Sequence, residues 1–208
     1  MMLAARRRRW VCPAMVAALA LLPVLARAAT LEVRVLDASG KPLADAVVFL
    51  ESDAARAAVK AAPQVDIAQI NRQFDPAVTV VPVGTAVNFP NRDTVRHHVY
   101  SFSPARKFEI KLYVGTPAAP VVFDQPGIAV LGCNIHDQMA AWVVVVATPW
   151  FGKTGADGQL RLAQVPAGNY RLRSWHAVLP VGSPPADQPL VVGAAAAQVA
   201  VRLGAVSP

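Results

Sequence analysis

Three side chains that bind soft metal ions lie within one short segment of the chain. The segment Cys133-Asn134-Ile135-His136-Asp137-Gln138-Met139 places a thiol, an imidazole and a thioether at C-x2-H-x2-M spacing. Thiolate and thioether ligands select copper over hard cations, and imidazole suits copper in either oxidation state. We therefore predict a copper site that uses Cys133, His136 and Met139.

One further ligand is needed to complete a known electron-transfer geometry. Two histidines and one cysteine in a trigonal set, with a distant axial methionine, form the type 1 or blue copper arrangement. The missing histidine must come from upstream, where His97 and His98 are adjacent. Because side chains alternate along a strand, only one of the two is expected to point toward the core. Zinc in a Cys-His-His site is chemically possible, but Met139 argues against zinc as the purpose.

The elements that must position these residues are predicted to be strands. Strongly apolar runs are short, rich in β-branched residues and separated by proline and glycine, as in residues 46–50, 78–83 and 142–146. This pattern is typical of all-β proteins. The run at 142–146 is almost continuously apolar, so we expect a strand that is buried on both faces. Residues 53–62 are rich in alanine and read as a linker or a short helix.

The two ends of the chain together contain the sequence motifs of one small domain. Residues 35–48, V-x-D-x-x-G-x-P-L-x-D-A-V-V in outline, resemble the opening of a transthyretin-like or carboxypeptidase-regulatory-like β-sandwich. The phrases that would follow, a T-x-x-D-G turn and G-x-Y-x-L, occur only at residues 154–172. This order predicts a sandwich in two parts, 29–52 and 149–208, interrupted by an insertion. The alternative is that both ends extend the middle domain with unrelated strands.

The middle of the chain, residues 63–148, contains a series of short motifs in a fixed order. They are Phe74-x-Pro76, Gly84-x-x-Val87-x-Phe89-x-Asn91, His97-x-Val99, Phe123-x-x-Pro126-Gly127 and Cys133-x2-His136-x2-Met139. In this order the motifs resemble those of a plastocyanin-like cupredoxin. The resemblance implies a Greek-key β-sandwich holding one type 1 copper, with the short ligand loop of amicyanin. It also implies His97, rather than His98, as the upstream ligand, because its distance from Phe89 and Asn91 fits the family pattern. The segments 97–103 and 131–137 are similar to those of exported bacterial proteins described as methylamine-utilisation proteins.

The first 28 residues have the pattern of a secretory signal peptide. A basic stretch at 6–9 precedes an apolar stretch at 10–25 and an Ala26-Arg27-Ala28 cleavage site; an uncleaved membrane anchor is the alternative. Cleavage would leave fifteen basic and thirteen acidic residues of the twenty and thirteen in the chain, so the net charge falls from +7 to +2. We therefore expect no nucleic-acid partner, no membrane association after cleavage and a periplasmic location. Cys133 would be the single cysteine left, which favours a ligand role.

These features together predict a periplasmic one-electron carrier rather than an enzyme. Four protein ligands leave no open position on the metal for a substrate. By resemblance, electrons would pass at the edge of His136 to a redox partner, a c-type cytochrome or a periplasmic dehydrogenase. Two alternatives stay open: a copper carrier or storage module that uses the same ligands, and a structural β-sandwich module without redox traffic.

Overall fold

The computed structural model describes residues 28–204, and nearly all of the regular structure in this range is β-strand. The predicted all-β class is therefore confirmed. The predicted signal peptide lies outside the described residues except for Ala28, whose backbone pairs with Pro166. No helix within residues 28–204 is both long enough and apolar enough to cross a membrane.

The two ends of the chain build one pair of sheets, which we call the split sandwich. A three-stranded sheet has the order β14-β1-β17 and a four-stranded sheet the order β13-β2-β15-β16. The first strand of the chain runs parallel to the last, β17, and antiparallel to β14. The strands are β1 (Ala28–Leu36), β2 (Val47–Glu51), β13 (Phe151–Lys153), β14 (Gln159–Pro166), β15 (Gly168–Trp175), β16 (Ala186–Val192) and β17 (Ala197–Arg202).

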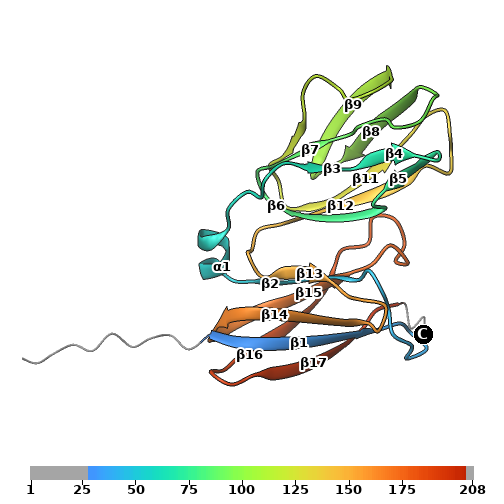
Figure 1. Cartoon of the computed structure of the whole chain (residues 1–208). Helices are drawn as coiled ribbons and strands as arrows, with labels where there is room; N and C mark the ends of the chain where they lie inside the picture. Colours follow the sequence, from blue (N-terminus) through green and yellow to red (C-terminus); the bar gives the residue numbers. More distant parts are fainter. Residues whose placement is uncertain (1–27, 205–208) are drawn as a thin grey trace, which may run out of the picture.

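The residues between β2 and β13 build a second pair of sheets, which we call the inserted sandwich (Figure 1). Its five-stranded sheet has the order β6-β12-β11-β8-β9, its three-stranded sheet the order β10-β7-β3, and β4 and β5 form a separate hairpin. The strands are β3 (Val65–Asp66), β4 (Ala68–Ile70), β5 (Gln73–Asp75), β6 (Val78–Pro82), β7 (Thr85–Asn88), β8 (His97–Ser103), β9 (Arg106–Tyr113), β10 (Val121–Phe123), β11 (Gly127–Gly132) and β12 (Ala140–Val146).

A short helix begins the connection from the split to the inserted sandwich. This helix, α1 (Asp53–Ala58), starts at Ser52, whose side chain accepts a hydrogen bond of 3.0 Å from the backbone N–H of Ala55. That cap satisfies one of the N–H groups that a helix start leaves without an intrahelical partner. The sequence left open whether this stretch is a linker or a helix, and its first part is a helix. The domain limits and the transthyretin-like character of the split sandwich stay predictions.

Strand β12 explains the continuous apolar run at 142–146. Val143 and Val145 point into the core of the inserted sandwich, whereas Val144 and Val146 pack in a separate cluster between the two sandwiches. The split sandwich contributes Phe49 and others to that cluster. The prediction of a strand buried on both faces is confirmed, because one face meets its own sandwich and the other meets the neighbouring one. Each such valine contributes about 1.5–3 kcal/mol through burial.

Candidate metal centre

Three of the predicted ligands come together in the inserted sandwich. The ligand atoms of His97, Cys133 and His136 all lie within 4.8 Å of one another. The rings of His97 and His136 meet edge to face, with centroids 5.0 Å apart. The Cys133 Sγ lies 4.0 Å from the His136 Nδ1. Residues far apart in the sequence thus converge at a spacing that one metal ion could bridge.

Two adjacent strands of the five-stranded sheet bring the histidine to the cysteine. His97 is the first residue of β8, and Cys133 directly follows the last residue of β11. The two strands pair through Tyr100 and Gly132. A Cβ added at Gly132 would lie 2.7 Å from the Tyr100 ring, so a larger residue there would require the Tyr100 side chain to shift. Glycine directly before Cys133 therefore lets the Tyr100 ring pack closely against the strand that carries the cysteine.

A tight loop between β11 and β12 supplies the other residues. The backbone N–H of Met139 donates to the carbonyl of His136 at 2.9 Å, which folds the loop back on itself. Met139 is almost fully buried and belongs to the same apolar cluster as Cys133. The fourth predicted ligand is therefore held in the same core that holds Cys133.

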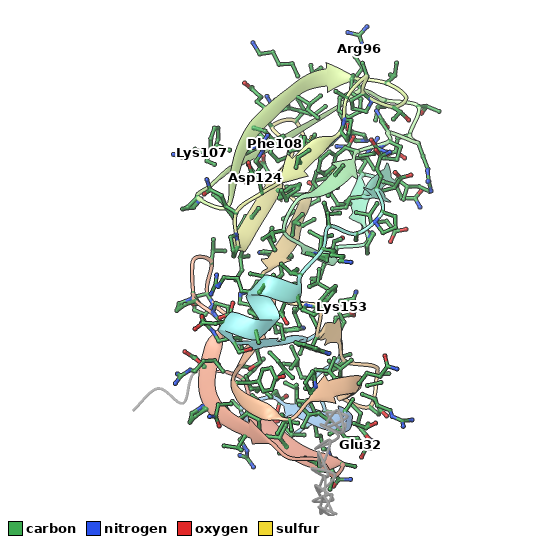
Figure 2. All side chains as sticks on the ribbon, turned by 90° about the vertical axis from the view of Figure 1, so that its left-hand side faces the viewer. Glu32, Arg96, Lys107, Phe108, Asp124 and Lys153 are labelled. Carbon is green, nitrogen blue, oxygen red and sulfur yellow. The ribbon has the colours of Figure 1, made fainter. Side chains whose placement is uncertain are left out.

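The site lies at the end of the inserted sandwich that faces away from the split sandwich. Arg96, which immediately precedes β8, lies at that end in Figure 2, whereas Glu32 of β1 lies at the opposite end of the molecule. Of the clustered residues, His97 and Cys133 are buried and His136 is partly exposed. The cluster is thus closed to solvent on most sides but accessible through His136.

The two ring nitrogens of His97 have different environments. Nε2 lies 2.7 Å from the Oδ2 of Asp93, while Nδ1 is buried and has no hydrogen-bond partner among residues 28–204. Buried polar atoms in native proteins are nearly always paired, so an unpaired one calls for an explanation. A metal ion bound through Nδ1 would supply the missing partner, and the soft donors Cys133 and Met139 favour copper in that role.

The neighbouring His98 does not join the cluster. Its Nε2 lies 3.1 Å from the Oε1 of Glu109, and its ring packs against Tyr100 with centroids 5.5 Å apart. Both histidines are buried, whereas alternation predicted only one in the core. The β8–β9 register shifts between His97 and Val99, so the regular alternation of the strand is interrupted at this point. The Nδ1 of His98 is also unpaired. An orphaned nitrogen alone therefore does not mark a ligand; proximity to Cys133 and His136 distinguishes His97.

The Asp93 carboxylate is held by several donors at once. It accepts backbone hydrogen bonds from Asn71 at 2.7 Å and from Arg72 at 2.9 Å, in addition to its contact with His97. Burial by itself would raise the pKa of Asp93, but the Arg72 N–H, the His97 side chain and the Asn71 N–H together lower it. Asp93 is therefore a carboxylate fixed beside the candidate ligand.

A second buried network lies next to Cys133. The Tyr113 hydroxyl is placed 2.7 Å from both the Oε1 of Gln69 and the carbonyl of Phe89. Burial raises the pKa of Tyr113 far above its usual range, and the nearby Cys133 side chain adds to the shift.

The sequence did not identify Asp93, Tyr113 or Gln69 as neighbours of the site. Asp93 lies four residues before His97, but spacing in a loop does not show which side chains turn back toward a strand.

Comparison with known proteins gives partial matches to copper proteins. No family model and no curated protein matches the chain. A copper-containing nitrite reductase from Thermus scotoductus is 26% identical with a TM-score of 0.37, and the match covers 39% of this chain and 22% of that one. A reduced Cu(I) amicyanin variant is 20% identical with a TM-score of 0.36, covering 48% and 98%. A purple cupredoxin from Nitrosopumilus maritimus is 24% identical with a TM-score of 0.35, covering 41% and 100%.

Proposed function

We propose that the protein is a periplasmic type 1 copper protein that transfers single electrons between redox partners. The observation that carries the proposal is the convergence of His97, Cys133 and His136 in a largely buried cluster, with Met139 in the adjoining core. One copper ion per chain would be held by these four residues. When bound, it would alternate between Cu(II) and Cu(I).

Burial of the ligands supports electron transfer over copper transport. His97 is fully buried, Cys133 is 4% exposed and Met139 is 1% exposed. A carrier must release its ion to an acceptor, which requires ligands that solvent and a partner can reach. Ligands fixed between β8, β11 and β12 instead limit rearrangement between oxidation states. The cluster geometry thus favours a resident ion over a passing one.

Each residue would have a defined task in the proposed site. Cys133 would bind as the thiolate, because metal coordination removes the thiol proton. His97 and His136 would bind through imidazole nitrogens, and the Met139 thioether would tune the reduction potential. His136 is the partly exposed member of the cluster, so its edge offers the shortest route for an electron to reach a partner.

The partner and location remain part of the proposal. A c-type cytochrome or a periplasmic dehydrogenase would exchange electrons at the His136 end of the molecule. Export would follow cleavage of the predicted signal peptide, and the protein would act as a carrier rather than an enzyme, because four protein ligands leave no position for a substrate.

The test is a Cu(II) titration of the processed chain, residues 29–208, followed by visible and electron paramagnetic resonance spectroscopy. We expect an intense visible band with narrow copper hyperfine splitting that saturates at one copper per chain. Reversible, fast one-electron oxidation would accompany it. A weakly coloured product, or copper that passes readily to an apo-acceptor with sluggish redox behaviour, would favour the carrier or the structural alternative.

A further inference from the structure

We propose that Asp93 is a positioning residue for the metal centre, which fixes His97 so that its Nδ1 is the free donor and strengthens that donor. The inference rests on the proposed function, because it assigns a role toward the same copper site. It concerns a carboxylate from a loop outside both ligand segments.

The contact with Asp93 determines which ring nitrogen of His97 carries the proton. Both oxygens of Asp93 already accept backbone N–H groups, Oδ1 from Asn71 and Oδ2 from Arg72. A carboxylate in that environment acts as an acceptor, so the 2.7 Å contact with His97 places a proton on Nε2. In the neutral ring the remaining lone pair is then on Nδ1, which is the nitrogen without a partner.

The Asp93 carboxylate is held in place by the turn of a neighbouring hairpin. Asn71 and Arg72 form the turn of the β4–β5 hairpin and both adopt a left-handed backbone conformation, with φ of 55°. In this turn their successive N–H groups both donate to Asp93. The Asp93 N–H in turn donates to the Asn91 Oδ1 at 3.0 Å. The carboxylate is thus held by two backbone donors, and the Asp93 backbone by Asn91, before the side chain meets His97.

The loop that carries Asp93 is itself anchored to the sheet through Asn91. The Asn91 side-chain amide donates to the carbonyl of Val95 at 2.8 Å and to that of Tyr113 at 2.9 Å. The Asn91 backbone also pairs with Gly115. Asn91 therefore closes the loop between β7 and β8 onto the end of β9, and the position of Asp93 relative to His97 is set by the sheet.

The Asp93–His97 contact has a chemical consequence for a bound copper ion. A carboxylate that accepts the far N–H of a ligating histidine fixes the ring orientation and raises the basicity of the ligand. A more basic ligand stabilises the more highly charged Cu(II) over Cu(I). Asp93 would therefore lower the reduction potential of the centre and tighten Cu(II) binding. Replacing such an outer partner typically weakens metal affinity about 10- to 100-fold.

The molecule contains a matched control. Glu109 makes the same kind of contact, at 3.1 Å, with the Nε2 of His98, which lies outside the cluster. Glu109→Gln removes a carboxylate from a buried histidine without touching a proposed ligand. A general effect of such pairs on folding or charge would appear in both variants, whereas a role toward the metal would appear only on replacement of Asp93.

The experiment compares the wild type with Asp93→Asn and Glu109→Gln. Nitrogen chemical shifts of the metal-free wild type should show His97 protonated at Nε2 and not at Nδ1; protonation at Nδ1 would overturn the proposal without any variant. Asp93→Asn should raise the reduction potential and weaken Cu(II) binding about 10- to 100-fold, and Glu109→Gln should change neither.

The outcomes separate the two proposals. A blue wild type whose potential and affinity are the same in Asp93→Asn would overturn the role of Asp93 and leave the copper site intact. A wild type that binds no copper would overturn the proposed function and the role of Asp93 with it. Circular dichroism and thermal unfolding of each variant show whether the chain as a whole still folds.

Discussion

The two sandwiches differ most in the polar groups that they bury. The split sandwich has an almost wholly apolar interior around Leu31, Leu50 and Leu172. The inserted sandwich surrounds its apolar centre with buried polar side chains, which are Gln69, Thr85, Asn91, His97, His98 and Ser101. Burying a polar group costs free energy unless it is paired. Buried polar groups are therefore expected where they serve a function. Their concentration in the inserted sandwich indicates that the chemistry takes place there, and that the split sandwich has a structural role.

Both sandwiches contain buried polar atoms without a partner among the described residues. In the inserted sandwich these include the Nδ1 atoms of both adjacent histidines, and in the split sandwich the Ser174 Oγ and the Arg173 Nε. The buried Thr154 hydroxyl of the split sandwich, by contrast, lies 2.6 Å from the Leu43 carbonyl and accepts the Ala46 N–H at 3.0 Å. The two sandwiches therefore differ in where the unpaired atoms lie, because the His97 Nδ1 is beside Cys133 and His136.

The largest expected effect is at Cys133. Cys133→Ser should abolish the intense visible absorption of the copper-loaded protein, because the absorption requires the thiolate bond that serine cannot form. Visible spectroscopy after Cu(II) addition measures this directly, with Glu109→Gln as the variant that keeps the colour. Persistence of the blue band in Cys133→Ser would show that the ligand assignment is wrong.

The second prediction concerns the core of the split sandwich. Leu31→Ala should lower the free energy of unfolding by about 2–5 kcal/mol, because it leaves a cavity at a fully buried position. The visible spectrum of the remaining folded protein should be unchanged, since the residue is remote from the cluster. Denaturant unfolding provides the measurement, and Val191→Ala, at a residue 74% exposed, is the control with little effect. A changed copper spectrum in Leu31→Ala would contradict the division of tasks.

The third prediction compares one hydrogen-bonded tyrosine from each sandwich. Tyr113→Phe removes the hydroxyl that lies beside both Gln69 and Phe89, and should cost about 1–3 kcal/mol because buried acceptors lose their partner. Tyr170→Phe removes a single hydrogen bond to the Pro166 carbonyl and should cost less. Thermal or denaturant unfolding of both variants gives the order. Equal losses would mean that the two networks do not differ in strength.

The smallest predicted effect is the pH response of a surface pair on the split sandwich. The hydrogen bond from Arg171 lowers the pKa of Asp187, outweighing the opposing effect of burial. A lowered carboxylate pKa stabilises the fold above the ordinary aspartate pKa of about 4, and the gain is lost as the pH falls through the folded pKa. Because the pair is exposed, it contributes about 1 kcal/mol or less. Unfolding of wild type and Asp187→Asn across acidic pH should differ near neutrality and converge at low pH. A constant difference would exclude this titration as the cause.

Much of the fold could be predicted because strands and turns leave local patterns in the sequence. The apolar runs at 46–50, 78–83 and 142–146 correspond to β2, β6 and β12, and the T-x-x-D-G turn lies directly before β14. The last strands were not predicted: β16 and β17 lie in a stretch with weak alternation, and β17 becomes a strand by pairing in parallel with β1 at the far end of the chain. The hairpin β4–β5 also went unrecognised, because each of its strands is only three residues long.

The sequence by itself determined the donor chemistry of the site. Ligand type and C-x2-H-x2-M spacing are local properties, so Cys133, His136 and Met139 could be chosen without a structure. The resemblance implied His97 rather than His98, but the physical reason is strand pairing and register. In the tertiary structure these bring His97 to Cys133 and place His98 beside Glu109. The carboxylate behind His97 was equally invisible in the sequence, because hydrogen bonds from a distant hairpin turn Asp93 toward the ring.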